Sequence, residues 1–161
     1  MAILKLVTGI DNKILRTPSV PVKKIDRKMK KLAHDMTETL FDCDGLGLAA
    51  PQIGQNIRLY IARLNYHTAN EMIVPMFNAE FTNMSDEFEE GEEGCLSLPG
   101  KFGVISRAKK VTVKYTDING KSVTLNLADM NARLMQHEID HLNGVLIADK
   151  MIREIKEEKL I

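Results

Sequence analysis

The stretch Gln136-His137-Glu138-Ile139-Asp140-His141-Leu142-Asn143-Gly144 is the part of the chain around which the predicted fold is organised. Helical residues four positions apart share a face, so His137 and His141 can direct two imidazoles at one point, a spacing typical of metal sites. Glu138 follows the first histidine, where a carboxylate can take a proton from water held by the metal. Helices also carry histidines for packing alone, so the metal interpretation requires a third ligand from elsewhere.

Cys95 is the best candidate for that ligand. A thiolate is a strong soft donor, and the neighbouring Gly94 and the nearby Pro99 indicate a segment exposed toward a site rather than an ordinary core strand. A lone cysteine is more often structural, and we keep that interpretation for Cys43. Two cysteines are too few for a disulfide framework, and a bridge between them would consume the proposed ligand, so we expect a reduced, cytoplasmic setting.

Length and composition favour one domain over residues 1–161. The chain has 44% apolar and 27% charged residues, which is typical of a globular protein. Its 22 basic and 22 acidic side chains leave no net charge, so nothing favours direct binding to nucleic acid or to an anionic membrane. We see no leader sequence and no apolar run near the ~20 residues of a membrane span.

Hydrophobic periodicity and turn residues predict the secondary structure. We interpret the acidic run over 83–93 as a solvated loop. Asp129 is expected to cap the histidine helix and Gly144 to end it. The other predicted elements are a short strand or extended entry at 3–7, a helical turn at 11–16, a helix from its cap Asp26 to about 44–45, strands at 57–64, 72–77 and 104–106, a hairpin over 111–127, a short strand at 145–147 and a terminal helix at 150–160.

Three segments resemble the signature motifs of the peptide deformylase family, in the same order and at compatible separations. They are Gly45-Leu46-Gly47-Leu48-Ala49-Ala50-Pro51-Gln52, Glu93-Gly94-Cys95-Leu96-Ser97 and Gln136-His137-Glu138-Ile139-Asp140-His141. The resemblance implies an α+β fold in which short antiparallel sheets surround a central helix that carries the His-Glu-x-x-His motif. It also implies removal of the N-formyl group from formyl-methionine at the start of nascent polypeptides, with release of formate.

The resemblance assigns a role to each matching residue. Cys95, His137 and His141 would hold one divalent metal ion: Fe2+ in the cell, with Zn2+, Ni2+ or Co2+ accepted by the isolated protein. Glu138 would be the general base and acid. The side-chain amide of Gln52 and the backbone N–H of Leu96 would donate hydrogen bonds to the oxyanion that forms during attack.

A substrate site is expected beside the metal. Gly47 and Gly94 lack a Cβ, so a peptide backbone can approach them and pair in the manner of a strand. Leu46, Met130 and Leu134 are candidates for the methionine pocket, although core packing explains them equally well. We expect Arg133 to snorkel outward. Gly91 and Phe102 stand where family members often carry other residue types, which leaves the shape of the pocket open.

Two other functions use the same helix. A metallopeptidase would cleave ordinary peptide bonds, whereas a metal-binding module without catalysis would need a fourth protein ligand. The partners expected for a deformylase are N-formyl-methionyl nascent peptides and, transiently, the ribosome.

Overall fold

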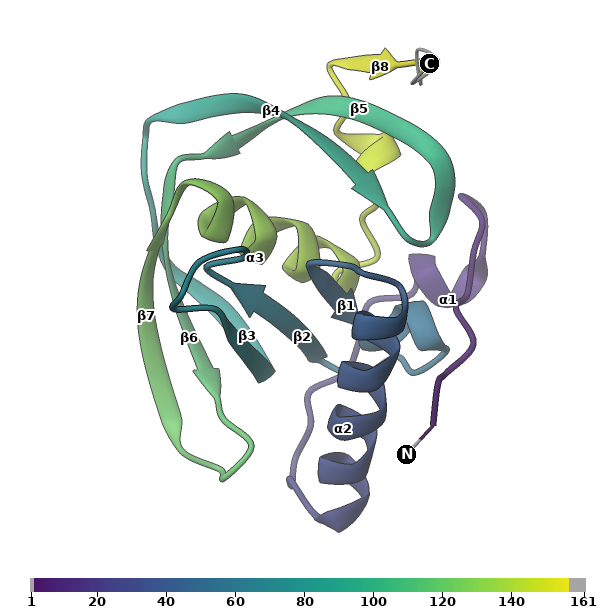
Figure 1. The fold of residues 1–161 in the computed structure, drawn as a ribbon, viewed down its shortest axis with the longest axis vertical. Helices are drawn as coiled ribbons and strands as arrows, with labels where there is room; N and C mark the ends of the chain where they lie inside the picture. Colours follow the sequence, from purple (N-terminus) through teal and green to yellow (C-terminus); the bar gives the residue numbers. More distant parts are fainter. Residues whose placement is uncertain (1, 157–161) are drawn as a thin grey trace.

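The computed structural model describes residues 2–156, and within them two antiparallel sheets enclose α3 (Figure 1). The larger sheet has the strand order β1-β2-β3-β6-β7, and the smaller has the order β4-β5-β8. This arrangement confirms the predicted α+β class with antiparallel sheets. The elements in chain order are α1 (Lys13–Arg16), α2 (Arg27–Asp42), β1 (Gly47–Ala49), the 3-10 helix η1 (Ala50–Ile53), β2 (Leu59–Leu64), β3 (Met72–Met84), β4 (Phe88–Cys95), β5 (Leu98–Ala108), β6 (Lys110–Thr116), β7 (Ser122–Ala128), α3 (Asp129–Leu142), the 3-10 helix η2 (Ile147–Asp149) and β8 (Arg153–Ile155).

The helix α3 lies between the β4–β5 hairpin on one side and the strands β1 and β2 on the other (Figure 1). Its buried residues include Ala132, Met135 and Leu142, which pack against apolar side chains of the larger sheet. A second apolar cluster joins α2 to β1 and β2, and a third joins α1, β5 and η2. The helix α3 is therefore packed on both faces, which holds its side chains in place.

The ends of the two long helices agree only in part with the predicted caps. Asp26 caps α2 as predicted, because its side chain accepts a hydrogen bond from the Met29 N–H. The assignment of Asp129 as a cap is wrong: Ala128 takes that position, and Asp129 is the first helical residue, with φ of 56°. The strand β7 runs directly into α3, where the Asp129 N–H is bonded to the Lys109 carbonyl and no side chain caps the helix. Gly144 follows the helix with φ of 74°, as expected for a terminating glycine.

The prediction of a solvated loop over 83–93 holds only for residues 85–87, which connect β3 to β4, and is wrong for the rest. Met84 ends β3, and β4 carries the acidic residues from Glu89 to Glu93 as a strand paired with β5 over its whole length. Strand alternation leaves Glu90 and Glu92 exposed but turns Glu93 inward. A run of acidic residues therefore includes one buried carboxylate, which composition alone does not distinguish from its neighbours.

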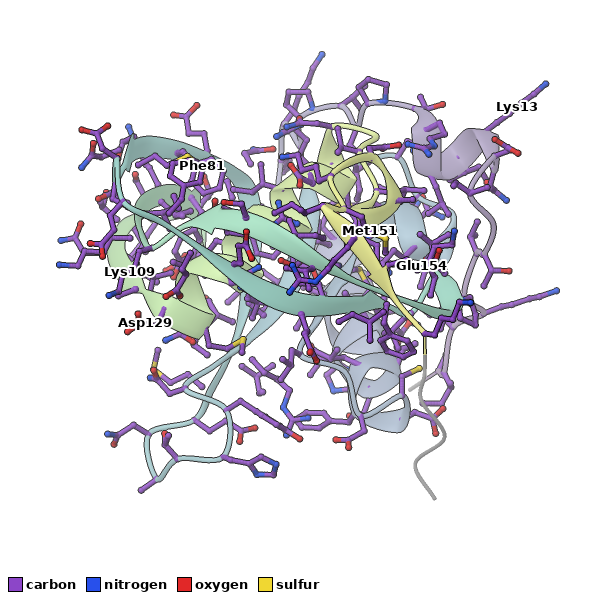
Figure 2. The ribbon with its side chains drawn as sticks, turned by 90° about the horizontal axis from the view of Figure 1, so that it is seen from above. Lys13, Phe81, Lys109, Asp129, Met151 and Glu154 are labelled. Carbon is purple, nitrogen blue, oxygen red and sulfur yellow. The ribbon has the colours of Figure 1, made fainter. Side chains whose placement is uncertain are left out.

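Several smaller predictions are also wrong. The strand alternative for segment 3–7 is wrong, because the segment belongs to no strand in the described chain. Residues 145–147 lead into the 3-10 helix η2 instead of pairing as a strand. The expected terminal helix over 150–160 is replaced by the strand β8, which pairs with β5; residues 157–161 of that prediction lie outside the described residues. Figure 2 shows the β4–β5 hairpin with Met151 lying over it. None of the described helices combines the length and apolar character needed to cross a membrane.

Candidate metal centre and active site

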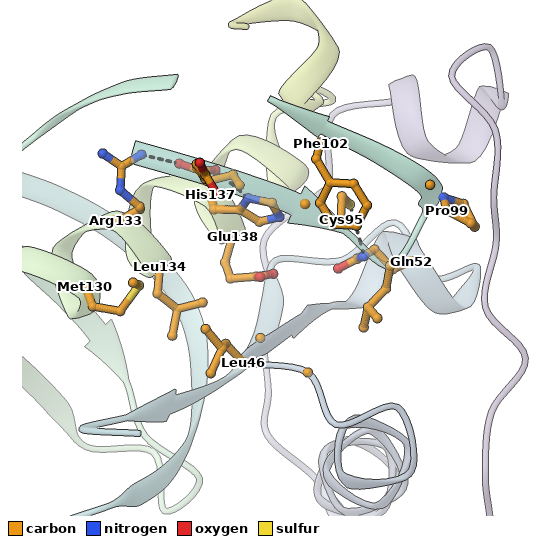
Figure 3. Close-up of a pocket in the computed structure, with 17 residues that line it drawn as sticks. Leu46, Gln52, Cys95, Pro99, Phe102, Met130, Arg133, Leu134, His137 and Glu138 are labelled. Atoms are coloured by element: carbon orange, nitrogen blue, oxygen red, sulfur yellow. Dashed lines mark hydrogen bonds and ion pairs between the residues drawn. The ribbon is translucent and has the colours of Figure 1, made fainter. Parts of the chain in front are cut away.

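A cavity of about 460 Å³ opens between α3, β1 and the end of β4 (Figure 3). It is lined by every residue predicted to belong to the site except His141, which is buried behind it. The lining residues are Gly45, Leu46, Gly47, Gln52, Glu92, Glu93, Gly94, Cys95, Leu96, Pro99, Gly100, Phe102, Met130, Arg133, Leu134, His137 and Glu138. The three sequence motifs, which lie far apart along the chain, meet in this one space.

The donor atoms of Cys95, His137 and His141 lie within 4.8 Å of one another. Consecutive turns of α3 supply the two imidazoles, and β4 supplies the thiol at its last residue. The Cys95 Sγ is 3.3 Å from the His141 Nε2. Two such ligands on a tetrahedral zinc ion would lie roughly 3.5 Å apart, given ordinary zinc–sulfur and zinc–nitrogen bond lengths. The three residues therefore fit a divalent metal, with no further protein ligand in this group among the described residues.

Glu138 is enclosed beside this set of donors. Its Oε2 is buried and has no hydrogen-bond partner among residues 2–156. The side chain packs against β1, where a Cβ at Gly47 would collide with its carboxylate. Burial raises the pKa of Glu138 to about 7, and the nearby Glu93 and Asp140 act in the same direction, whereas His137 opposes them. A carboxyl group with this pKa can both accept and release a proton near neutral pH.

Glu93, which the sequence interpretation missed, organises the other side of the centre. Its Oε1 lies 2.8 Å from the His137 Nδ1, so the His137 Nε2 is left to face the cavity. Arg107 donates to both carboxylate oxygens at 2.9 Å, and the Arg133 Nη1 donates to the Oε2 at 2.6 Å. Burial alone would raise the pKa of Glu93, but the hydrogen bonds and charges of His137 and Arg107 hold it well below the usual range. The position of Glu93 two residues before Cys95 on a strand was the available signal, because alternate residues share a face.

The two histidines differ in their protonation. Burial and the neighbouring positive charges lower the pKa of His141 well below its usual value, so its ring is neutral. Burial also acts to lower the pKa of His137, but hydrogen bonds to Cys95 and Glu93 outweigh it and raise the pKa to about 10 in the metal-free protein. A histidine that ligates a metal must be neutral, so cation binding by this set would release a proton from His137.

Gln52 is fixed at both ends of its amide. Its Oε1 accepts a hydrogen bond from the Ala49 N–H at 2.9 Å, and its Nε2 donates to the Ser97 Oγ at 3.2 Å and contacts the Cys95 Sγ at 3.7 Å. The amide nitrogen therefore points toward the donor set (Figure 3). Ser97, buried and adjacent to Leu96, is a second residue that the sequence interpretation did not single out.

The pocket residues combine two roles. Leu134 is 7% exposed, packs in the core and lines the cavity, as does the partly buried Leu46, whereas Met130 lies 58% exposed at its rim. The two glycines also have a packing role. A Cβ at Gly47 would meet the Glu138 carboxylate, and one at Gly94 would meet the ring of Phe102. Pairing of a substrate backbone with these glycines stays a prediction.

Arg133 and Asp140 are held by ion pairs on α3. Arg133 does not snorkel outward, as expected from sequence, but is buried against Glu93. Asp140 pairs with Arg107 at 2.6 Å and with Lys150 at 3.1 Å. Arg107 thus connects the β4 carboxylate to the turn of α3 that follows His137.

Comparison with known proteins gives consistent results. The family model described as Polypeptide deformylase matches residues 4–157. A peptide deformylase from Desulfotalea psychrophila is 40% identical over 152 residues, which cover 94% of this chain and 89% of the relative. The crystal structure of peptide deformylase from Thermotoga maritima matches with a TM-score of 0.88 and 38% identity, covering 95% of this chain and all of that one. A Met-Ala-Ser-bound class I type b peptide deformylase from Acinetobacter baumannii matches with a TM-score of 0.87 and 35% identity, covering 93% and 99% of the two chains.

Proposed function

The chain belongs to the polypeptide deformylase family, whose members deformylate nascent peptides, and from this premise we propose a metal-dependent hydrolysis of formyl-methionyl chain ends that releases formate. One observation carries the proposal: the buried, unpartnered carboxylate oxygen of Glu138 lies beside three metal-ligating side chains in a cavity of the described chain. A proton acceptor next to a metal site is the arrangement that hydrolysis of an amide requires.

Cys95, His137 and His141 would hold one divalent ion, which we propose is Fe2+ in the cell. When bound, such an ion supplies Lewis-acid chemistry and makes a water molecule acidic enough to attack at neutral pH. One thiolate and two imidazoles also suit Zn2+, Ni2+ and Co2+, so the isolated protein is expected to accept these metals. Glu93 supports the set by orienting the His137 ring through its Nδ1.

Glu138 takes the proton of the attacking water, whose oxygen adds to the formyl carbon. The Gln52 amide and the Leu96 backbone N–H donate to the oxygen that becomes negatively charged, and each donor is expected to lower the barrier by about 3 kcal/mol. Glu138 then gives the proton to the amine as the carbon–nitrogen bond breaks. Formate and a free N-terminal amine are the products.

The cavity receives the first residue of the substrate. Leu46, Leu134 and Met130 provide apolar surface for a methionine side chain, while the open mouth lets the following residues leave the protein. The related A. baumannii enzyme binds Met-Ala-Ser, which supports a peptide ligand of this kind. We extend the proposal to action as a single catalytic domain in the cytoplasm on nascent chains, with transient ribosome contact that co-sedimentation with translating ribosomes would test.

Formate release from formyl-Met-Ala-Ser by the Fe2+- or Ni2+-loaded protein tests the proposal. We expect activity in the wild type and its loss in Glu138→Ala, with metal content unchanged because Glu138 is not a ligand. Absence of formate release by the loaded wild type would refute the proposal. Cleavage of an unformylated internal peptide bond, with formyl peptides untouched, would select a metallopeptidase instead.

A further inference from the structure

Arg133 brings a charged group to the wall of the cavity. It comes from the turn of α3 that precedes His137 and extends toward β4 (Figure 3). Its Nη1 donates to the Glu93 Oε2 at 2.6 Å and to the Ile105 carbonyl at 3.0 Å, and its Nη2 donates to the Glu89 carbonyl at 2.9 Å. The guanidinium is thus fixed to both strands of the β4–β5 hairpin while the residue still lines the cavity.

The guanidinium of Arg133 fits against β4 only because position 91 is a glycine. A Cβ built at Gly91 would lie 2.8 Å from the Arg133 Cζ and 2.9 Å from its Nη2, closer than real Cβ atoms approach such neighbours. Any other residue at position 91 would therefore push the guanidinium away from β4. The glycine and the arginine form one structural unit, in which a missing side chain on β4 makes space for a long one from α3.

The guanidinium of Arg133 has more N–H donors than its contacts with described residues use. It carries five N–H groups, and the contacts with described residues use three of them, which leaves the Nε–H and one Nη2 N–H. Its charge is only partly balanced, since Glu93 is shared with Arg107 and His137. Leu46 and Leu134, which are apolar, line the same cavity as Arg133.

From these observations, and resting on the proposed function, we propose that Arg133 is a specificity-determining residue that admits a first side chain ending in a hydrogen-bond acceptor. The substrate class then includes chain ends with formyl-methionine sulfoxide as well as formyl-methionine. A sulfoxide oxygen is a strong acceptor, and burying it in a wholly apolar pocket would leave it without a partner. A spare guanidinium N–H supplies that partner, whereas the methionine thioether is only a weak acceptor and gains little.

Arg133→Met tests the proposal, because methionine removes the charge while filling most of the same volume. Arg153→Met, on the exposed β8, is the matched control, since the Arg153 side chain is 64% exposed. We would measure kcat/KM for the Ala-Ser tripeptides that begin with formyl-methionine, its sulfoxide or formyl-norleucine. The ratio of sulfoxide to methionine should fall roughly 10- to 100-fold in Arg133→Met and stay unchanged in the control, as expected for loss of a hydrogen bond to a charged group. The ratio of norleucine to methionine should change less than about threefold, because neither side chain has a strong acceptor.

The ratio separates specificity from stability. If Arg133 only supports Glu93, the rates for all three peptides fall together in Arg133→Met, and an unchanged sulfoxide ratio would overturn the inference. Gly91→Ala, which displaces the guanidinium without removing it, should lower the same ratio. If neither variant folds, a wild-type enzyme that rejects the sulfoxide more than about 100-fold relative to methionine overturns the inference. Absence of formate from every peptide overturns the proposed function itself.

Discussion

Glu93→Gln should weaken both the fold and the metal site. The carboxylate accepts two hydrogen bonds from Arg107, one from Arg133 and one from His137, and each of its oxygens faces two of these donors. Glutamine keeps the shape but offers one acceptor oxygen, so its NH2 group must point at donors. The substitution therefore removes about half of the hydrogen bonds and the whole negative charge from a buried cluster.

The magnitude follows from these contacts. Losing two hydrogen bonds to charged groups costs roughly 3–6 kcal/mol, which agrees with the roughly 3–5 kcal/mol measured when one partner of a buried ion pair is removed. For a chain of this length, a loss of about 4 kcal/mol corresponds to a decrease in Tm of about 8–16 °C. The ring of His137 also loses its orienting acceptor, which should weaken metal affinity by about 10- to 100-fold.

Urea denaturation of the metal-free protein measures the first effect, and competition with a chromophoric chelator measures the second. Glu90→Gln is the matched control on the same strand, because the Glu90 side chain is 56% exposed and its ion pair with Arg153 is long, at 3.7 Å. The control should change the free energy of unfolding by less than about 0.5 kcal/mol. A loss below about 1 kcal/mol in Glu93→Gln, with metal affinity unchanged, would refute the role given to this carboxylate.

Three further outcomes are expected. Gly47→Ala should lower kcat by about 100-fold or more, because its methyl group displaces the carboxylate of Glu138. Gly103→Ala is equally crowded, but its methyl group would meet Met151, which does not line the cavity; it should lower stability without lowering kcat, and equal kcat losses would contradict this. Gln52→Ala should lower kcat about 100-fold in the formate assay, as expected for one lost oxyanion donor, and an unchanged kcat would exclude that role. Since the pKa of Glu93 is lowered on folding, its contribution to stability is complete above its ordinary value of 4.5 and is lost as pH falls below it; urea titrations from pH 7 to 3 should show this loss, and Glu93→Gln should show a smaller one.

Local patterns predicted those parts of the site that depend on residue type and spacing. The His137–His141 spacing holds because α3 is a regular helix, and the motif around Cys95 reaches the same cavity. Glu93 and Arg133 were misjudged for a common reason. Charged residues are usually exposed, and these two charges are buried against each other because α3 packs against the β4–β5 hairpin.

The predicted secondary structure failed where long-range pairing decided the outcome. The acidic residues of β4 have little intrinsic preference for strands, but pairing with β5 turns Glu93 inward, where its side chain forms an ion pair with Arg107, and leaves Glu90 in solvent. The sequence of the terminal segment 150–160 predicts a charged helix, yet Arg153 to Ile155 pair with β5 because that strand offers an open edge. Neither partner can be identified from the segment alone.

The strand β4 supplies the thiol of Cys95 and, two residues earlier, the carboxylate that orients His137. A slip of one residue in its pairing with β5 would turn both groups to the opposite face together. The metal centre is thus an indicator of correct hairpin assembly. A chain with the wrong register would lose both the Cys95 ligand and the Glu93 carboxylate that orients His137. Metal uptake during refolding should therefore coincide with formation of the β4–β5 ladder rather than follow gradually from the helix.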